Sequence, residues 1–117
     1  MKAKVISTML LLFSTSVLGS DPVYYTGENV EICNPPSEII HRPEISGGPY
    51  FLNYGKDKSS SYLTVVIWER DISKLEINPY TYFQVDNACV RGEVTLYRER
   101  KQITIRDSSQ VFVSKNK

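Results

Sequence analysis

ACVRGEVTLYRERKQITIRDSSQVFV, residues 88–113, is the stretch that decides the fold of this chain. Apolar and polar residues alternate along its first half, which is the period of a strand with one buried face. The residues that share the inward parity are Ala88, Val90, Gly92, Val94, Leu96, Ile103 and Ile105. Polar residues 98–101 interrupt the pattern over a length that suits a hairpin loop. The stretch therefore predicts two strands joined by a charged tip, with Gly92 at a bend or bulge.

Three further strands are predicted upstream of this hairpin. They are expected at residues 29–33 with a continuation at 38–42, at 50–55, and at 62–69, where YLTVVIWE is the most β-prone run in the chain. Residues 71–75 suit a short helical turn, residues 77–82 are expected to be irregular, and a last short strand is expected at 110–113. Five strands with a short helical connection between the third and fourth follow the order of an OB-fold. The predicted class is therefore an all-β, five-stranded OB-fold barrel.

The N-terminal segment reads as a signal peptide over residues 1–20. Lys2 and Lys4 precede an apolar run at positions 5–17, and small residues follow near position 19. The apolar run is too short for a membrane span, so none is expected in the mature chain, with an uncleaved N-terminal anchor as the alternative. The rest of the chain is expected to divide into an arm at 21–28, the OB-fold domain at 29–113 and a loose tail at 114–117.

The chain has two cysteines, Cys33 and Cys89. An even number of cysteines in an exported chain suggests a disulfide. Cys33 shares parity with Glu31, and Cys89 shares parity with Arg91, so both thiols are expected on the polar faces of strands that pairing would bring together. We therefore predict a Cys33–Cys89 disulfide and a periplasmic or secreted location. Two free thiols in a reducing compartment are the alternative.

The charge of the chain is close to neutral. Lys and Arg number 14 against 13 Asp and Glu, for a net charge of +1. Removal of Lys2 and Lys4 with the leader would make the mature chain slightly acidic. This balance argues against a strongly basic nucleic-acid binder, whose affinity comes largely from neutralised phosphates. Basic residues nevertheless outnumber acidic ones from Arg91 to the C-terminus.

Several motifs resemble one known family. They are GPYFLNYGKD at 48–57, LTVVIW at 63–68, CVRGEV at 89–94, YR at 97–98, QITI at 102–105 and SQV at 109–111. These look like small exported bacterial OB-fold modules, which occur alone or attached to extracellular nucleases and read roughly TFLNFGKD, FTVVIW and CVxGxIxxYRGxPQIxVxxPSQI. The resemblance covers about residues 28–113. The chain departs from it at Asn34, Glu99, Lys101 and Ser108, and Glu99 stands where the family has the glycine of its YRGxP hairpin.

The sequence contains no recognisable catalytic set. His41 is the only histidine, and no second histidine or cysteine pair stands at metal-ligand spacing from it. No Ser-His-Asp or Cys-His arrangement can be built, and Gly47-Gly48 is too short to cradle a phosphate. We therefore expect no enzyme activity, no cofactor and no metal.

The resemblance implies a binding function on the usual OB ligand face. That face is formed by the second and third strands and by the loops after the first and fourth strands. Aromatic rings there stack on bases, and Arg or Lys side chains contact phosphates. The expected nucleic-acid-binding residues are Tyr50, Tyr62, Arg91, Arg98, Arg100 and Lys101, with Tyr54 and Trp68 as further aromatic candidates. The expected ligand is single-stranded nucleic acid.

Two alternative functions remain open at this level. The domain suits a structural or protein-interaction module of a periplasmic or cell-envelope assembly, because tyrosine-rich surfaces are common at protein interfaces and the arm at 22–25 would fit a docking segment. It also suits an oligosaccharide-binding domain that uses tyrosines as platforms. Against all of these stands the interpretation that the aromatic residues pack in the core and that residues 98–101 are a solvated tip.

Overall fold

A computed structural model describes residues 22–56 and 61–115; the predicted signal peptide at 1–20 lies outside them. The described chain is mostly β, so the predicted class is confirmed at that level. Its strands are β1 (Asn29–Ile32), β2 (Glu38–His41), β3 (Tyr50–Tyr54), β4 (Leu63–Ile67), β5 (Ala88–Glu93), β6 (Thr95–Tyr97), β7 (Arg100–Ile105) and β8 (Val111–Val113). Its helices are α2 (Glu69–Leu75), α3 (Pro79–Tyr82) and the 3-10 turn η1 (Ser108–Gln110). Within the described ranges, no helix has the length and apolar character to cross a membrane.

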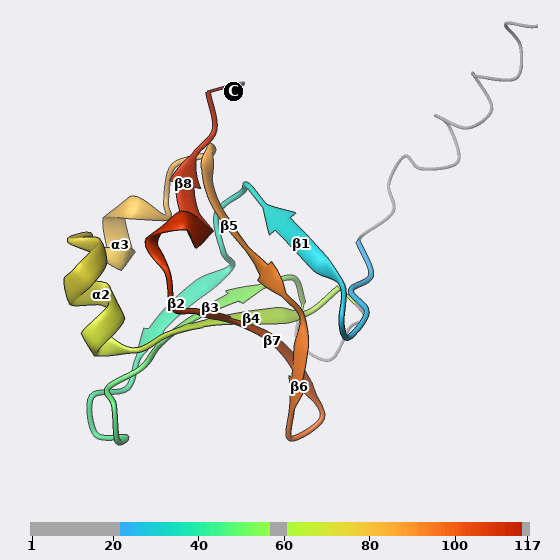
Figure 1. Cartoon of the computed structure of the whole chain (residues 1–117), viewed down its shortest axis with the longest axis horizontal. Helices are drawn as coiled ribbons and strands as arrows, with labels where there is room; N and C mark the ends of the chain where they lie inside the picture. The colour runs from blue at the N-terminus through green and yellow to red at the C-terminus, as the bar shows by residue number, and fades with distance from the viewer. Residues whose placement is uncertain (1–21, 57–60, 116–117) are drawn as a thin grey trace, which may run out of the picture.

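The strands form two sheets instead of the single five-stranded barrel that the sequence predicts. A three-stranded antiparallel sheet has the order β1-β5-β8, and a five-stranded sheet has the order β2-β3-β4-β7-β6. All pairs in the larger sheet are antiparallel except β4 with β7, which run parallel. Figure 1 shows the smaller sheet crossing above the larger one, with α2 and α3 at one end of both.

The connection between β4 and β5 is more helical than the sequence predicts. Helix α2 begins at Glu69, before the expected Asp71, and α3 occupies part of the stretch expected to be irregular. Pro79 is the reason for α3, because proline at the first helical position has the right φ and its missing N–H costs nothing there. The Asn78 side chain caps the turn by accepting a hydrogen bond from the backbone N–H of Tyr80 at 2.9 Å.

The predicted hairpin exists, but its first strand is divided and its tip is shorter. Val94 separates β5 from β6, so one stretch of chain passes from the smaller sheet into the larger. Tyr97 pairs with Arg100, which leaves a loop of two residues, Arg98 and Glu99, in place of the expected four. Both loop residues have positive φ, 51° and 65°, as the favoured two-residue hairpin turn requires.

Most of the predicted inward positions are confirmed as core. Ala88, Val90, Val94, Ile103 and Ile105 are buried, and they pack with Leu52, Leu63, Val65, Ile67 and Phe83. The prediction for Leu96 is wrong, because 55% of this residue is exposed. Its strand, β6, pairs only with β7 at the edge of the larger sheet, so little of the protein lies over it.

Gly92 marks the close crossing of the two sheets. A Cβ atom at this position would lie 2.6 Å from Cγ2 of Ile103 and 2.9 Å from Nε2 of Gln110. Its own backbone stays in the extended region, so the close approach of neighbouring side chains, not a turn, explains the glycine.

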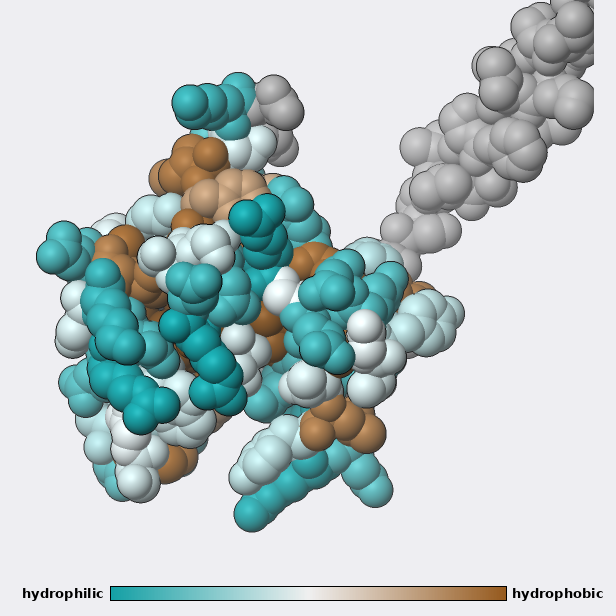
Figure 2. Space-filling view, in the orientation of Figure 1, coloured by the Kyte–Doolittle hydropathy of each residue, from teal (hydrophilic) through white to brown (hydrophobic). Residues whose placement is uncertain are grey.

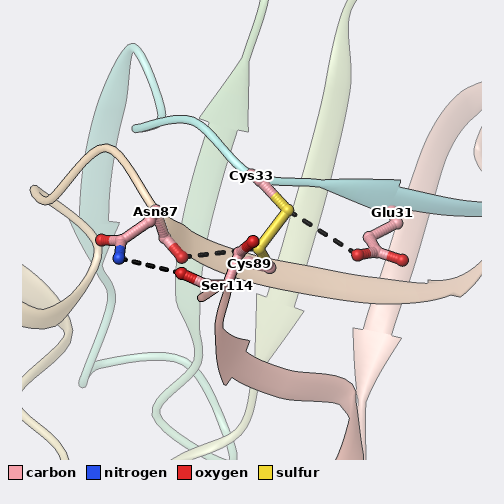
Figure 3. Close-up of a disulfide and its surroundings, with 5 residues drawn as sticks. All are labelled: Glu31, Cys33, Asn87, Cys89 and Ser114. Atoms are coloured by element: carbon pink, nitrogen blue, oxygen red, sulfur yellow. Dashed lines mark hydrogen bonds between the residues drawn. A yellow bond between two sulfur atoms is a disulfide. The ribbon is translucent and has the colours of Figure 1, made fainter. Parts of the chain in front are cut away.

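The Cys33–Cys89 disulfide joins β1 to β5, as predicted (Figure 3). Ile32 pairs with Val90 in the antiparallel register, so the next residues, Cys33 and Cys89, stand opposite each other. The expected polar-face setting is wrong for Cys89, which is fully buried. Strand β8 pairs along that part of β5, with Phe112 opposite Cys89, and thereby adds a neighbour that a five-strand scheme lacks.

The predicted arm packs onto the body of the domain. Tyr24 belongs to the core, and its carbonyl oxygen accepts a hydrogen bond from Nζ of Lys101. Main-chain bonds join Gly27 and Glu28 to Val94, at 2.7 and 2.8 Å. Residues 22–28 therefore bridge the place where β5 passes into β6.

Candidate functional site

The outward side of the five-stranded sheet, here called the outer face, carries the candidate site. Paired residues of neighbouring strands share a face, and the row Ile39, Leu52, Val65 and Ile103 points into the core. The next rows therefore point outward. They comprise Ile40, Phe51, Val66 and Thr104 in one row, and Glu38, Asn53, Thr64 and Gln102 in the other.

The floor of the outer face is held by a buried polar chain. Oγ1 of Thr64 donates to Oδ1 of Asn53 at 2.8 Å, and Nδ2 of Asn53 donates to Oε2 of Glu38 at 2.9 Å. Thr64 and Asn53 are both buried, so this chain satisfies polar groups that would otherwise be costly. It also fixes the Glu38 carboxylate at the edge of the face.

A cavity of about 290 Å³, here called the hairpin pocket, lies where the outer face meets the β6–β7 hairpin. The guanidinium of Arg100 lies over the ring of Tyr62, with Cζ 5.8 Å from the ring centroid. Arg98 lies over the ring of Tyr97 in the same way, at 5.3 Å. The pocket is lined by Ile40, Arg42, Phe51, Asn53, Tyr62, Thr64, Tyr97, Arg100 and Gln102. It thus combines aromatic rings with guanidinium groups. In Figure 2 the hairpin projects from the body of the domain.

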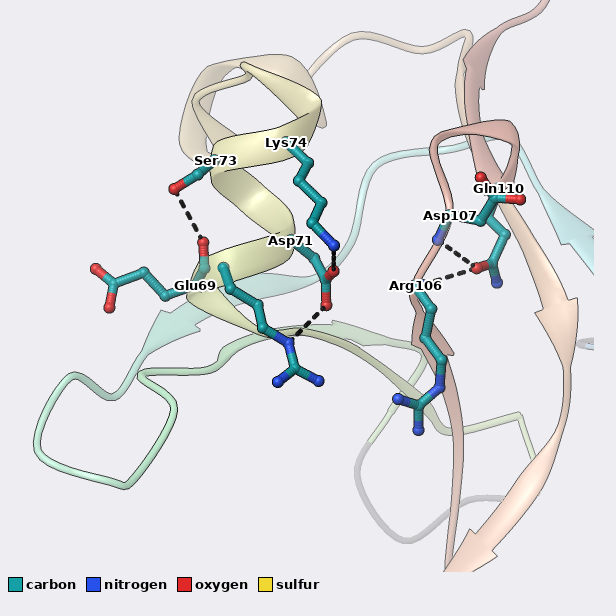
Figure 4. Close-up of polar contacts among 8 residues, drawn as sticks. Glu69, Asp71, Ser73, Lys74, Arg106, Asp107 and Gln110 are labelled. Carbon is teal, nitrogen blue, oxygen red and sulfur yellow. Dashed lines mark hydrogen bonds and ion pairs between the residues drawn. The ribbon is translucent and has the colours of Figure 1, made fainter.

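A larger cavity of about 920 Å³, here called the helix pocket, lies between the loop at residues 43–48 and the start of α2. Trp68, Arg70 and Arg106 supply its aromatic and basic groups. Gly47 brings the loop backbone onto the indole, since a Cβ there would lie 2.8 Å from Cε3 of Trp68. Figure 4 shows the first turns of α2 facing Arg106, which follows β7.

Ion pairs divide the arginines of these pockets into two groups. Arg42 pairs with Glu44, and its hydrogen bond lowers the pKa of that carboxyl. Arg70 lies 3.9 Å from the buried Asp71 carboxylate, which Lys74 also approaches at 3.7 Å (Figure 4). The remaining arginines, Arg98, Arg100 and Arg106, form no ion pair with any described residue. Their charges are therefore the ones available to an anionic ligand.

The structure brings together only part of the predicted set. Tyr62 and Arg100 line the hairpin pocket, and Arg98 lies over the ring of Tyr97, which lines it as well. Tyr50 instead has the inward parity and stacks on His41, with ring centroids 3.9 Å apart. Tyr54, the further aromatic candidate from the same strand, is buried in the core.

Two of the predicted basic residues serve contacts within the domain. Arg91 lies on β5, in the smaller sheet; its Nε donates to the Ser109 carbonyl at 3.2 Å and its guanidinium lies over Phe112. Lys101 donates to Tyr24 and lies over the ring of Tyr25 at 5.7 Å. Both are therefore placed away from the hairpin pocket.

Other members of the site were missed by sequence reasoning. They are Phe51, Tyr97 and Gln102 in the hairpin pocket and Arg106 in the helix pocket. Strand parity was a usable signal for the first three, because each has the parity opposite to a core residue of its own stretch. The core residues are Leu52 for Phe51, Val94 for Tyr97 and Ile103 for Gln102. The position of Arg106 depends on the packing of α2 against the end of β7, for which the sequence has no comparable signal.

No protein-family model, no curated protein and no solved structure matches this chain.

Proposed function

We propose that this chain is an exported OB-fold module that binds single-stranded nucleic acid on its outer face without catalysis. The observation that carries the proposal is the hairpin pocket, where Arg100 lies over Tyr62 beside Tyr97. Rings of this kind stack on bases of any sequence, and the neighbouring guanidiniums attract the phosphates.

The strand pairing supports the OB-fold part of the proposal. In this interpretation β1 and β2 are two halves of one interrupted strand, and β5 and β6 are two halves of another. The pairings β2-β3, β3-β4, β4-β7, β7-β6 and β5-β1 then make a circuit of five strands, with α2 and α3 between the third and the fourth. Such a circuit is the order of a partly open OB barrel, to which β8 is an addition.

The position of the two pockets supports a ligand path across the sheet. The helix pocket adjoins the loop that joins β2 to β3, and the hairpin pocket adjoins the loop that joins β6 to β7. Polar side chains of β7, Gln102 and Thr104, lie on the outer face between Arg100 and Arg106. A bound strand would thus meet a basic and aromatic contact at each end.

The proposed export rests on the leader-like sequence at 1–20 and on the disulfide. Disulfides persist in the periplasm and outside the cell, and they are rare in reducing compartments.

The test is a fluorescence anisotropy titration of a labelled single-stranded oligonucleotide at low and at moderate salt. Tyr62→Ala is expected to weaken binding about 5- to 150-fold, from a stacking contribution of roughly 1–3 kcal/mol per base. Arg100→Ala is expected to weaken binding as well, because it removes a guanidinium that attracts the phosphates. The salt dependence is expected to be shallow, since each phosphate contact adds only about 0.7 to the slope of log K against log salt and few arginines are available.

Arg91→Ala is the matched control, because it removes the same charge from the opposite sheet. Its affinity should stay close to that of the unaltered protein. The proposal is wrong if no binding is seen at low salt, or if Arg91→Ala weakens binding as much as Arg100→Ala does.

A second candidate function, protein interaction, is favoured by a different surface. Val23, Tyr25 and Leu96 are exposed. Lys101 links the last two, since it lies over the Tyr25 ring and pairs with Leu96 across the hairpin. Exposed apolar side chains of this kind suit a partner in a cell-envelope assembly. If this surface binds a partner, Leu96→Glu will abolish crosslinks in the envelope fraction and leave oligonucleotide binding unchanged.

A further inference from the structure

The helix pocket has a basic side and an acidic side, with Trp68 between them. Ile67 of β4 pairs with Ile105 of β7 in parallel register, so the residues that follow, Trp68 and Arg106, leave the sheet side by side. Strand β3 pairs along the other edge of β4, and the loop that precedes β3 packs against the indole of Trp68. Arg106 therefore lies on one side of the indole, and the loop at residues 43–48 lies on the other.

The acidic side of the pocket is formed by the exposed carboxylate of Glu69. Its Oε1 lies so close to the loop that a Cβ atom at Gly48 would come within 2.8 Å of it, and Figure 4 shows the side chain directed away from Arg106. Glu69 makes no ion pair with any described residue. Arg70 also lines the pocket, but the Asp71 carboxylate, 3.9 Å away, offsets its charge. The Arg106 side thus attracts a phosphate, whereas the Glu69 side repels one.

We propose that the helix pocket binds the unphosphorylated end of a single strand, an inference that rests on the function proposed for the outer face. The last phosphate of the strand contacts Arg106, the terminal base stacks on Trp68, and the terminal sugar hydroxyl donates a hydrogen bond to the Glu69 carboxylate. The cavity of about 920 Å³ has room for a nucleoside, since pockets of about 300–1,000 Å³ hold ligands of that size. Dinucleotide-binding folds use an Asp or Glu carboxylate in the same way, as the acceptor for a ribose hydroxyl.

The order of charges along the outer face favours a strand end over the middle of a strand. A strand that follows β7 from Arg100 in the hairpin pocket reaches the helix pocket at Arg106, which has the same parity. If the strand continued past the indole, its next phosphate would lie against the carboxylate of Glu69, and like charges so placed are unfavourable. A terminal phosphate at that position meets the same repulsion. The pocket should therefore distinguish a strand end that carries a hydroxyl from one that carries a phosphate.

The test is an anisotropy titration with single strands of one sequence and about eight nucleotides, a length within the roughly 4–16 that one OB-fold binds. The label is internal, and the strands carry hydroxyls at both ends, a phosphate at the 5′ end, a phosphate at the 3′ end, or a phosphate at both. The doubly phosphorylated strand should bind about 3- to 10-fold more weakly than the strand with two hydroxyl ends, through loss of one hydrogen bond. The singly phosphorylated strands show which end is bound. Added phosphate would otherwise strengthen attraction to basic groups, so weaker binding has the opposite sign to a general charge effect.

Glu69→Gln is the decisive variant, because it removes the charge and keeps an oxygen that accepts a hydrogen bond. Its affinities for the four strands should become nearly equal. Glu93→Gln is the matched control, since it removes the same charge from an exposed position on the smaller sheet and should keep the preference for hydroxyl ends.

Two results would overturn the proposal and leave nucleic-acid binding by the outer face in place. They are equal binding of all four strands by the unaltered protein, and a preference for hydroxyl ends that persists in Glu69→Gln. If none of the four strands binds at low salt, the function proposed for the outer face is wrong, and the end-binding proposal is wrong with it.

Discussion

Tyr54 is a buried phenol without a hydrogen-bond partner among the described residues. Only 3% of it is exposed, and burial raises the pKa of its hydroxyl well above the usual value of about 10. Above that pH the unfolded chain loses the proton while the folded protein keeps it, so the stability of the fold decreases as pH rises. Near neutral pH, the Tyr54→Phe variant should be as stable as the unaltered protein or more stable by up to about 1 kcal/mol. At alkaline pH it should lose less stability than the unaltered protein does.

Urea unfolding at neutral and alkaline pH measures both effects. Tyr25→Phe is the control, because 65% of Tyr25 is exposed and its pH dependence should match that of the unaltered protein. A Tyr54→Phe variant that is clearly less stable at neutral pH would show that the hydroxyl has a favourable partner.

At the same scale, the sequence predicts which residue types suit the binding face better than it predicts on which side of the sheet each side chain lies. Tyr62 and Arg100 were identified because their chemistry suits the ligand, and both reach the hairpin pocket. Tyr50 has the same chemistry but the opposite parity, so it packs on His41. The sequence places Lys101 in the tip, whereas the two-residue turn places it within β7, opposite Leu96. Strand register decides such cases, and it depends on the turn.

At the scale of the element, the β6–β7 turn requires a left-handed backbone conformation that its two residues, Arg98 and Glu99, do not favour. Glu99 has φ of 65°, in the left-handed region that costs an ordinary residue roughly 1–2 kcal/mol. Glu99→Gly should therefore stabilise the protein by about 1 kcal/mol in urea unfolding, while Arg98 and its contact with Tyr97 stay in place.

Glu93→Gly is the matched control for this substitution. Glu93 lies in the extended strand β5, so glycine there should destabilise the protein by about 0.5–1 kcal/mol. If Glu99→Gly is destabilising as well, the turn does not have the left-handed conformation at that position.

The elements themselves were predictable where the pattern was strong. Strands β4 and β7 are expected near their observed bounds, because a run of β-branched residues identifies β4 and alternation identifies β7 without help from the rest of the fold. The break at Val94 was not predicted, since Val94 continues the alternation and is buried as expected. The break arises because the chain passes from the smaller sheet into the larger one at Val94. The local sequence pattern does not show to which sheet a residue belongs.

At the scale of the molecule, the disulfide is the main covalent constraint on a small core. It closes a loop with a sequence separation of 56, which the chain-entropy model values at about 4 kcal/mol. Reduction of the disulfide should therefore lower the free energy of unfolding by about this amount, as measured by urea titration. A variant with both Cys33→Ser and Cys89→Ser should have the lower stability whether or not a reductant is present. If reduction leaves the stability of the unaltered protein unchanged, the estimate is wrong.

The parallel pairing of β4 with β7 also sets the order of folding events. The two strands are separated by both helices, by β5 and by β6, so this pairing within the larger sheet cannot form until the chain is almost complete. Non-local pairing of this kind delays folding, because the entropy of closing the intervening loop is lost before the contacts form. Until residue 105 has been synthesised, the side of β4 that will pair with β7 therefore remains an open strand edge, to which strands of other chains could add.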